Sequence, residues 1–185
     1  AVVAVLLIQI LEIFAITFLA AATLIGMKGK KMNDLPMFFA HTGIAAVALG
    51  IFFVSVFDAK YEAVMKKGDV AKIAGYEVKF LGTEIGKAEN YVYRRGIFDA
   101  NGVTLKPEMR IYPIERNTST ESAIHTHYLN DLYVVIGEPY KAGFAVRIYH
   151  KPLMNLIWLG LLVTAFGGVA RLVISLYPSR RLLQA

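Results

Sequence analysis

Three long apolar runs constrain this chain more than any other feature. They cover residues 1–26, 35–57 and 153–170, and the third continues past Arg171 as LVISLY. A helix crosses the roughly 30 Å hydrocarbon core of a bilayer with about 20 apolar residues, so each run is long enough to span it, with Arg171 reaching toward one surface. The pattern predicts three transmembrane helices, at 1–27, 35–57 and 152–176.

The basic residues predict the orientation of these helices. Lysines gather in the short loop 28–34, and arginines lie in the tail 177–185. Because basic loops tend to remain in the cytoplasm, we expect this loop and this tail on the cytoplasmic side. The segment 58–151 joins the second and third helices and is therefore expected to be extracytoplasmic. Its charges of both signs indicate a globular surface and argue against nucleic-acid binding.

Residues 58–151 have the pattern of an all-β domain, either a small sandwich or a barrel. Short alternating segments such as YEVKFLG (76–82) and DLYVVIG (131–137) are separated by Gly, Pro, Asn and Asp. This spacing is typical of strands joined by turns, and DANG at 99–102 predicts a hairpin turn. At 60–69, the stretch KYEAVMKKGD instead favours a short helix. The chain has no cysteine, which excludes disulfide and thiol chemistry of its own.

His41 is the residue that least suits the apolar run in which it lies. On a helix that begins near Pro36, it lies inside the hydrocarbon region of the bilayer. An ionisable residue there indicates a functional site. Three roles stay open from the residues alone: a hydrogen bond to a neighbouring helix, an axial bond to haem iron, and a proton relay. The same helix face carries apolar side chains that suit a haem, among them Met37, Phe38, Ile44 and Ala45.

Polar and small residues mark the other two apolar runs. Glu12 lies in the middle of the first, with Gln9 one turn before it. A charged carboxylate is costly there, so we expect Glu12 to be protonated or paired, either in an interhelical hydrogen bond or in proton movement. In the third run, Gly160, Thr164 and Gly168 recur every four residues, with Gly167 beside the last, which is typical of close helix packing in lipid.

Three histidines lie in the β domain. His125 and His127 have the H-x-H spacing that points two imidazoles the same way from a strand, but no third or fourth metal ligand is evident nearby. His150 lies beside Lys151 and is expected at the surface. We therefore expect this domain mainly to bind and position rather than to catalyse.

Several phrases, taken in order, resemble one protein family. They are PMFFAHTGIAAVALGI, GYEVKFLG, ENYVYRRGIF, LKPEMRIYPIERNTSTESAI, NDLYVVIGE and VRIYHKPLMNLIWLGLLVTAFGGVARL. Together they are similar to the C-terminal part of the CcmF family, the haem lyase subunit of bacterial-type cytochrome c maturation. The resemblance implies that His41 is an axial ligand of a transmembrane haem b. Members of this family attach haem to the two thiols of CxxCH in apocytochrome c, and the resemblance implies a part in this reaction.

The chain departs from this family in two ways. The family's haem-handling WWD segment is absent, and the only tryptophan is Trp158. The family's second haem b ligand is not matched by His125, His127 or His150. We therefore expect a split subunit or a C-terminal fragment that is not active alone. Its implied partners are the remaining part of CcmF, with the WWD segment and the second haem ligand, a haem chaperone and other maturation proteins, apocytochrome c and the membrane.

The resemblance also implies a location, the cytoplasmic (inner) membrane, with the β domain on the periplasmic side. Two other functions stay open from the residues alone. One is a non-catalytic membrane scaffold on which maturation partners assemble. The other is a quinol-linked or proton-linked membrane protein that uses Glu12 and His41.

Overall fold

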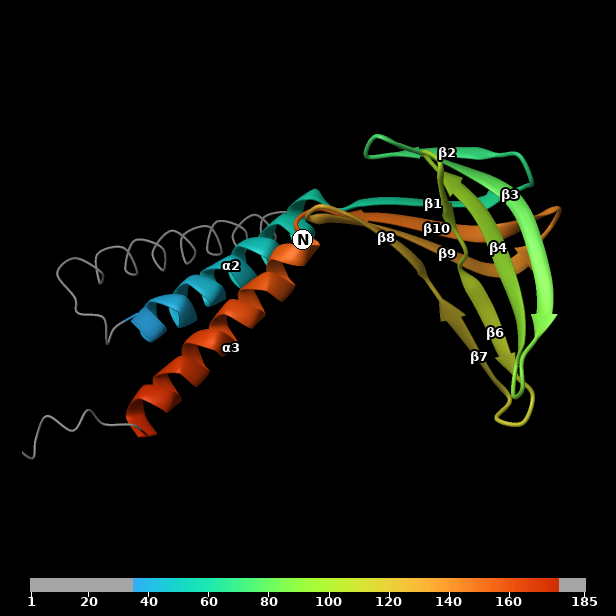
Figure 1. Ribbon diagram of the computed structural model, residues 1–185. Helices are drawn as coiled ribbons and strands as arrows, with labels where there is room; N and C mark the ends of the chain where they lie inside the picture. Colours follow the sequence, from blue (N-terminus) through green and yellow to red (C-terminus); the bar gives the residue numbers. More distant parts are fainter. Residues whose placement is uncertain (1–34, 177–185) are drawn as a thin grey trace, which may run out of the picture. The chain divides into compact units, whose positions relative to one another are not determined.

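The structure is a computed structural model that describes residues 35–176. In chain order these residues form helix α2, ten strands (β1 to β10) and helix α3 (Figure 1). They belong to two compact units, a helical unit and a β domain over Phe57–Pro152. The predicted helix at 1–27, the loop 28–34, the tail 177–185 and Glu12 lie outside the described residues.

The helical unit contains α2 (Leu35–Phe57) and α3 (Met154–Leu176). Each helix is long and apolar enough to cross a membrane. Pro36 lies in the first turn of α2, where its missing N–H removes no helical hydrogen bond. Two apolar helices therefore flank the β domain in the sequence, which is the arrangement of a membrane protein with a β domain.

The β domain is a sandwich of two antiparallel sheets. The first sheet has the strand order β1 (Ala59–Met65), β10 (Gly143–Lys151), β9 (Asn130–Tyr140), β8 (Ala123–His127). The second has the order β2 (Val70–Ile73), β3 (Tyr76–Lys87), β4 (Val92–Ala100), β6 (Glu108–Tyr112), β7 (Asn117–Glu121), and β5 (Val103–Leu105) pairs with β4. The chain changes sheets from β1 to β2 and from β7 to β8, so edge strands of the two sheets follow each other directly in the sequence.

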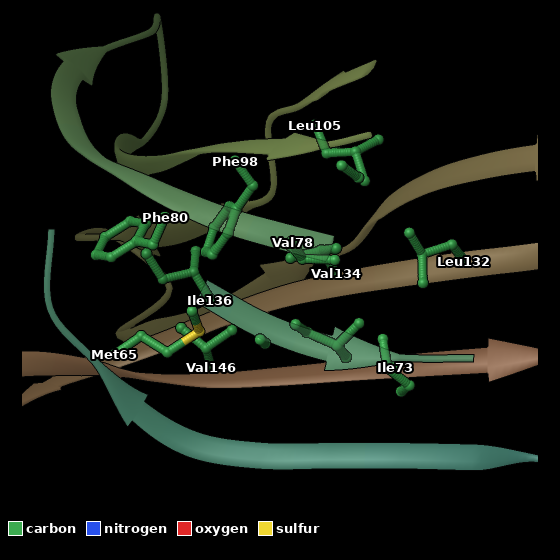
Figure 2. Close-up of a cluster of buried hydrophobic side chains, with 13 residues drawn as sticks. Met65, Ile73, Val78, Phe80, Phe98, Leu105, Leu132, Val134, Ile136 and Val146 are labelled. Atoms are coloured by element: carbon green, nitrogen blue, oxygen red, sulfur yellow. The ribbon is translucent and has the colours of Figure 1, made fainter. Parts of the chain in front are cut away.

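A core of apolar side chains lies between the two sheets. Figure 2 shows its side chains pointing into this space from both sheets. Phe80 and Phe98 are register partners on β3 and β4, and their rings stack with centroids 4.8 Å apart. Both are buried, as are Val134 and Ile148 of the facing sheet. Buried positions alternate with more exposed ones along β2, the first half of β3 and the second half of β4, as a sheet with one face on a core requires.

The helix predicted at 60–69 is wrong. Residues Ala59–Met65 form β1, which pairs with β10 along its whole length, from Ala59 opposite His150 to Met65 opposite Phe144. The stretch contains good helix formers, but its more exposed and less exposed side chains also alternate, with the charged side chains outside and Met65 buried in the core. Pairing with a long neighbouring strand outweighed the local helix preference.

The hairpin turn predicted at 99–102 is confirmed. Asn101 and Gly102 connect β4 to β5 with φ angles of 50° and 86°. A two-residue hairpin turn of this kind needs positive φ at both positions, which Asn and Gly adopt at little cost. The Asn101 side chain also accepts a hydrogen bond from the Glu77 amide at 2.9 Å, which ties the turn to β3.

Candidate functional site

The two helices contact each other through glycines. A methyl group built on Gly160 would lie 2.6 Å from the Gly43 carbonyl oxygen, and one built on Gly167 would lie 2.6 Å from the Pro36 carbonyl oxygen. A Cβ on Gly50 would lie 2.7 Å from the Ile157 side chain. These distances leave no room even for a methyl group at the three glycines. Because glycine has no side chain, the backbones of α2 and α3 can approach closely.

Polar and aromatic contacts accompany the glycines. The Thr164 hydroxyl donates to the Gly160 carbonyl at 2.8 Å and lies 3.4 Å from the Ala40 carbonyl of α2. The rings of Phe39 and Phe166 meet edge to face at 5.4 Å. Of the predicted stripe, Gly160 and Thr164 contact α2, whereas a methyl group built on Gly168 would meet no atom of the described residues within 4 Å. Gly167 takes its place, because 3.6 residues per turn brings position 167, and not 168, round to α2.

His41 lies on the other side of α2. The contact with α3 uses positions 36, 40, 43, 47 and 50, and at 100° per residue His41 is about 140° from the centre of that stripe. Its side chain is exposed within the described residues. The Nδ1 atom lies 2.7 Å from the Met37 carbonyl oxygen one turn earlier. A carbonyl only accepts, so Nδ1 carries the hydrogen and Nε2 keeps a lone pair that points away from the helix.

The side chains that share the His41 face are apolar. Met37 and Ile44 are exposed, and Phe38 and Ala45 are half-buried. A haem would find there one free imidazole nitrogen and apolar contacts for its ring, so the residues present fit this group. Their assignment as haem contacts stays a prediction.

Two of the three histidines of the β domain lie close together. His125 and His127 point the same way from β8, with ring centroids 6.3 Å apart. Within residues 35–176 no group of three or more His, Asp or Glu side chains is arranged to hold a metal ion. His150 was expected at the surface, but it is half-buried. It shares a register row with Leu132 of the core, and burial lowers the pKa of its imidazole.

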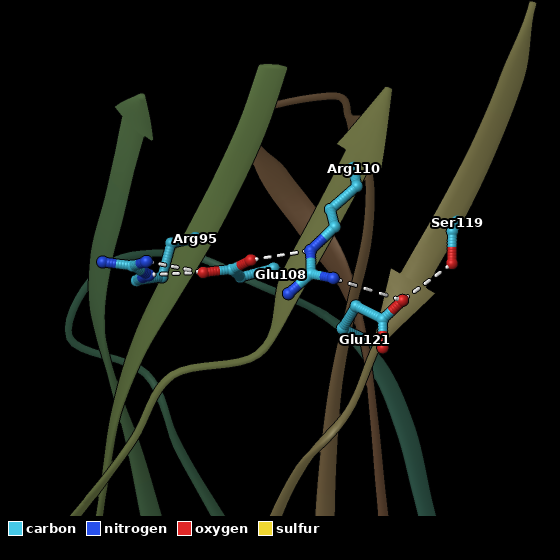
Figure 3. Close-up of polar contacts among 5 residues, drawn as sticks. All are labelled: Arg95, Glu108, Arg110, Ser119 and Glu121. Atoms are coloured by element: carbon cyan, nitrogen blue, oxygen red, sulfur yellow. Dashed lines mark hydrogen bonds and ion pairs between the residues drawn. The ribbon is translucent and has the colours of Figure 1, made fainter. Parts of the chain in front are cut away.

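A charged network on the second sheet could not be predicted from the sequence (Figure 3). Glu108 is only 9% exposed and accepts hydrogen bonds from Arg95 at 2.6 and 2.8 Å and from Arg110 at 2.9 Å. Arg110 also lies 3.7 Å from Glu121, which accepts a bond from the Ser119 hydroxyl.

The protonation of Glu108 follows from these contacts. Burial acts to raise the pKa of Glu108, but the hydrogen bonds from Arg95 and Arg110 outweigh burial and hold it below its ordinary value. The network therefore stabilises the sheet as a set of paired charges. Alternation on β6 places Glu108 and Arg110 on one face, whereas the pairing with Arg95 depends on the β4–β6 register.

Comparison with known proteins gives one consistent family. Residues 56–152 match the family model described as the CcmF C-terminal β-sandwich, which is more than half of the chain. The cytochrome c-type biogenesis protein CcmF of Pseudomonas aeruginosa is 36% identical over 151 residues, which are 78% of this chain and 23% of that protein. CycK of Bradyrhizobium diazoefficiens is 38% identical over 139 residues, 72% of this chain and 21% of that protein.

A longer match and a solved structure agree with this result. CcmF of Escherichia coli is 34% identical over 177 residues, 90% of this chain and 27% of that protein. The solved structure of a cytochrome c haem lyase CcmF shares the fold, with a TM-score of 0.66 at 17% identity, over 87% of this chain and 28% of that one. The chain thus spans about a quarter of the length of the relatives that it matches.

Proposed function

Since this chain belongs to the family of the CcmF C-terminal β-sandwich, we propose that it is the C-terminal part of a cytochrome c haem lyase and that His41 holds a haem b in the membrane. The relatives are named as cytochrome c-type biogenesis proteins, and this chain matches about a quarter of the length of each. The proposal assigns to this chain the binding of the cofactor and of partners, and not the whole reaction.

The geometry of His41 carries the proposal. Its Nδ1–H is donated to the Met37 carbonyl at 2.7 Å, which fixes the ring orientation and leaves Nε2 as the ligating nitrogen. When bound, the haem supplies an iron that accepts this lone pair and changes oxidation state by one electron. Met37 and Ile44 would exclude water from one edge of the group. The bond to iron would offset the cost of keeping an imidazole in an apolar segment.

The remaining parts of such an enzyme would come from elsewhere in the complex. The other three histidines of this chain lie on β8 and β10. We propose that the second haem ligand and the WWD segment belong to the part of the relatives that this chain does not span. The sandwich would position the haem chaperone and apocytochrome c on the periplasmic side of the inner membrane.

A second candidate function is that of a scaffold without haem. One observation favours it: the Nδ1 atom of His41 already has a hydrogen-bond acceptor within α2, the Met37 carbonyl oxygen at 2.7 Å. In this case His41 would only bond within its own helix.

The test compares His41→Ala with Thr42→Ala in the assembled complex. Both side chains are exposed on α2 and differ by 100° in direction, so Thr42 is a matched control for helix insertion. We expect His41→Ala to lose the low-spin spectrum of a six-coordinate haem and Thr42→Ala to keep it. A His41→Ala complex with an unchanged low-spin spectrum would rule out the ligand role and leave the scaffold.

A further inference from the structure

The tip of the β8–β9 hairpin has an unusual composition. Tyr128 and Leu129 form the whole connection between His127 of β8 and Asn130 of β9. The Tyr128 side chain is 85% exposed and Leu129 is 41% exposed. Tyr128 has a φ of 54°, in the left-handed region where Gly, Asn or Asp is favoured at such a turn. A large aromatic side chain is thus exposed at this turn, with its ring centroid 4.4 Å from that of the His127 ring.

The strand register places this tip at one particular end of the domain. In the strand register, Asp131 of β9 lies opposite Lys151, the last residue of β10. Ala59, the first residue of β1, lies opposite His150. Because β9 and β10 are antiparallel, the tip extends beyond Asp131 in the direction in which the chain leaves β10. It therefore lies at the end of the domain from which the chain continues into both candidate membrane helices.

The chain connections at this end are short. One residue separates the end of α2 from β1, and two residues separate β10 from α3. An extended residue covers at most about 3.6 Å, so these connections reach no farther than about 10 Å. The headgroup layer on each side of a bilayer is about 5–8 Å thick, the difference between its full thickness and its hydrocarbon core. This end of the domain is therefore tethered within reach of the lipid headgroups.

Aromatic and basic side chains lie at the same end. Lys60 and Lys151 place their ammonium groups 5.8 and 5.9 Å from the centre of the Tyr149 ring. Lys60 also pairs with Glu62 at 2.6 Å. Tyrosine is enriched where membrane proteins cross the headgroup region, and lysines there extend toward phosphate. The combination of Tyr149 with two lysines matches that environment and is independent of the hairpin tip.

We infer that Tyr128 and Leu129 insert into the headgroup region of the bilayer, with Lys60 and Lys151 facing lipid phosphate. The ring of Tyr128 would lie at the boundary of headgroup and acyl chain, with its hydroxyl toward water. This contact would fix the sandwich at a constant height and tilt above the membrane. It concerns lipid and does not depend on the haem proposed at His41.

The opposite end of the domain offers a matched control. Ile114 lies between β6 and β7 and is 85% exposed, the same fraction as Tyr128. Lys87, at the end of β3, shares a register row with Val92 and Ile111, and Ile114 follows that row along the chain. Tyr76 is at the opposite end of β3, and its ring lies 6.4 Å from that of His125 on β8, the strand that leads to the hairpin tip. An apolar side chain at Ile114 is therefore equally exposed but far from the two chain connections.

The experiment attaches a nitroxide spin label to single cysteines in the full-length protein, made cysteine-free elsewhere. The present chain contains no cysteine that would compete. Tyr128→Cys, Leu129→Cys and Ile114→Cys are reconstituted in vesicles of phosphatidylethanolamine and phosphatidylglycerol. Collisions of the label with oxygen, which concentrates in lipid, are compared with collisions with a water-soluble nickel complex.

The expected result is a severalfold higher oxygen-to-nickel ratio at positions 128 and 129 than at position 114. Leu129→Cys leaves Tyr128 in place, so it reports the position of the tip even if replacing Tyr128 changes the shape of the turn. Equal, nickel-dominated ratios at all three positions would show that the tip lies in water and would overturn the inference. Low collision rates with both reagents at the tip would show a covering protein, which would overturn it as well. The haem spectrum is recorded separately and can be normal in every outcome.

Discussion

The helical unit and the β domain bury opposite kinds of residue. The residues buried in α2 and α3 are Pro36 and four glycines, whereas large side chains such as Leu162 and Phe166 are exposed. The β domain instead buries Phe80, Phe98 and Met65. In water, apolar side chains are driven inside, but lipid is as apolar as leucine and exerts no such force. The difference shows that close backbone packing holds the helices together, and that the hydrophobic effect holds the sandwich.

The largest test of this contrast is a truncation in the sandwich core. Phe98→Ala removes a fully buried ring that stacks on Phe80, and we expect a loss of about 3–5 kcal/mol in the free energy of unfolding of the β domain. Leu162→Ala on α3, where the side chain is 69% exposed, is expected to change thermal stability little. Thermal unfolding of the purified protein measures both, and equal losses would contradict the contrast.

The charged network of the sandwich is the next test. Glu108→Gln keeps the shape of the side chain but removes the charge that Arg95 and Arg110 share, and we expect a loss of about 3 kcal/mol, at the low end for a broken buried pair. Glu121→Gln, at an exposed carboxylate, should cost less than about 1 kcal/mol. Chemical denaturation at pH 7 measures the difference, and similar losses for the two variants would show that burial of Glu108 is unimportant.

This network also predicts a pH dependence. Because the pKa of Glu108 is lowered in the folded protein, the unfolded chain binds the proton more readily. The stabilisation is therefore complete above the ordinary value of 4.5 and is lost as the pH falls through the lower folded value. Glu108→Gln should show a flatter decline in stability over this acid range than the unchanged protein.

The helix contact gives the smallest expected effect. Gly160→Leu would push a side chain into the Gly43 carbonyl and the Val47 side chain, and overpacking of this kind costs about 1–3 kcal/mol. A methyl group built on Gly168 would meet no atom of the described residues within 4 Å, so Gly168→Leu serves as the matched control. Disulfide formation between cysteines at positions 39 and 166, whose rings meet in the unchanged protein, reports the helix contact. We expect cross-linking to fall for Gly160→Leu and to persist for Gly168→Leu.

Local patterns predicted much of the β domain and missed what depends on distant partners. The alternating segments at 76–82 and 131–137 lie within β3 and β9, and the turn at 99–102 is as expected. Strands β2, β5, β7 and β8 are three to five residues long, too short for alternation to stand out. The segment 60–69 was assigned to a helix because its residues favour one in isolation, while its partner β10 lies about 85 residues further along the chain.

The sequence by itself determined where α2 and α3 lie, that the segment between them is β, and that an imidazole lies within α2. These features depend on hydrophobicity and periodicity over short stretches, which the residues carry without any partner. Only the tertiary structure decided that Gly167 rather than Gly168 contacts α2, that His41 faces away from α3, that Glu108 binds two arginines, and that Tyr128 lies at the end of the sandwich leading to both helices. Each of these depends on the rotation of one helix against another or on the register of strands far apart in the sequence, and long-range packing sets both.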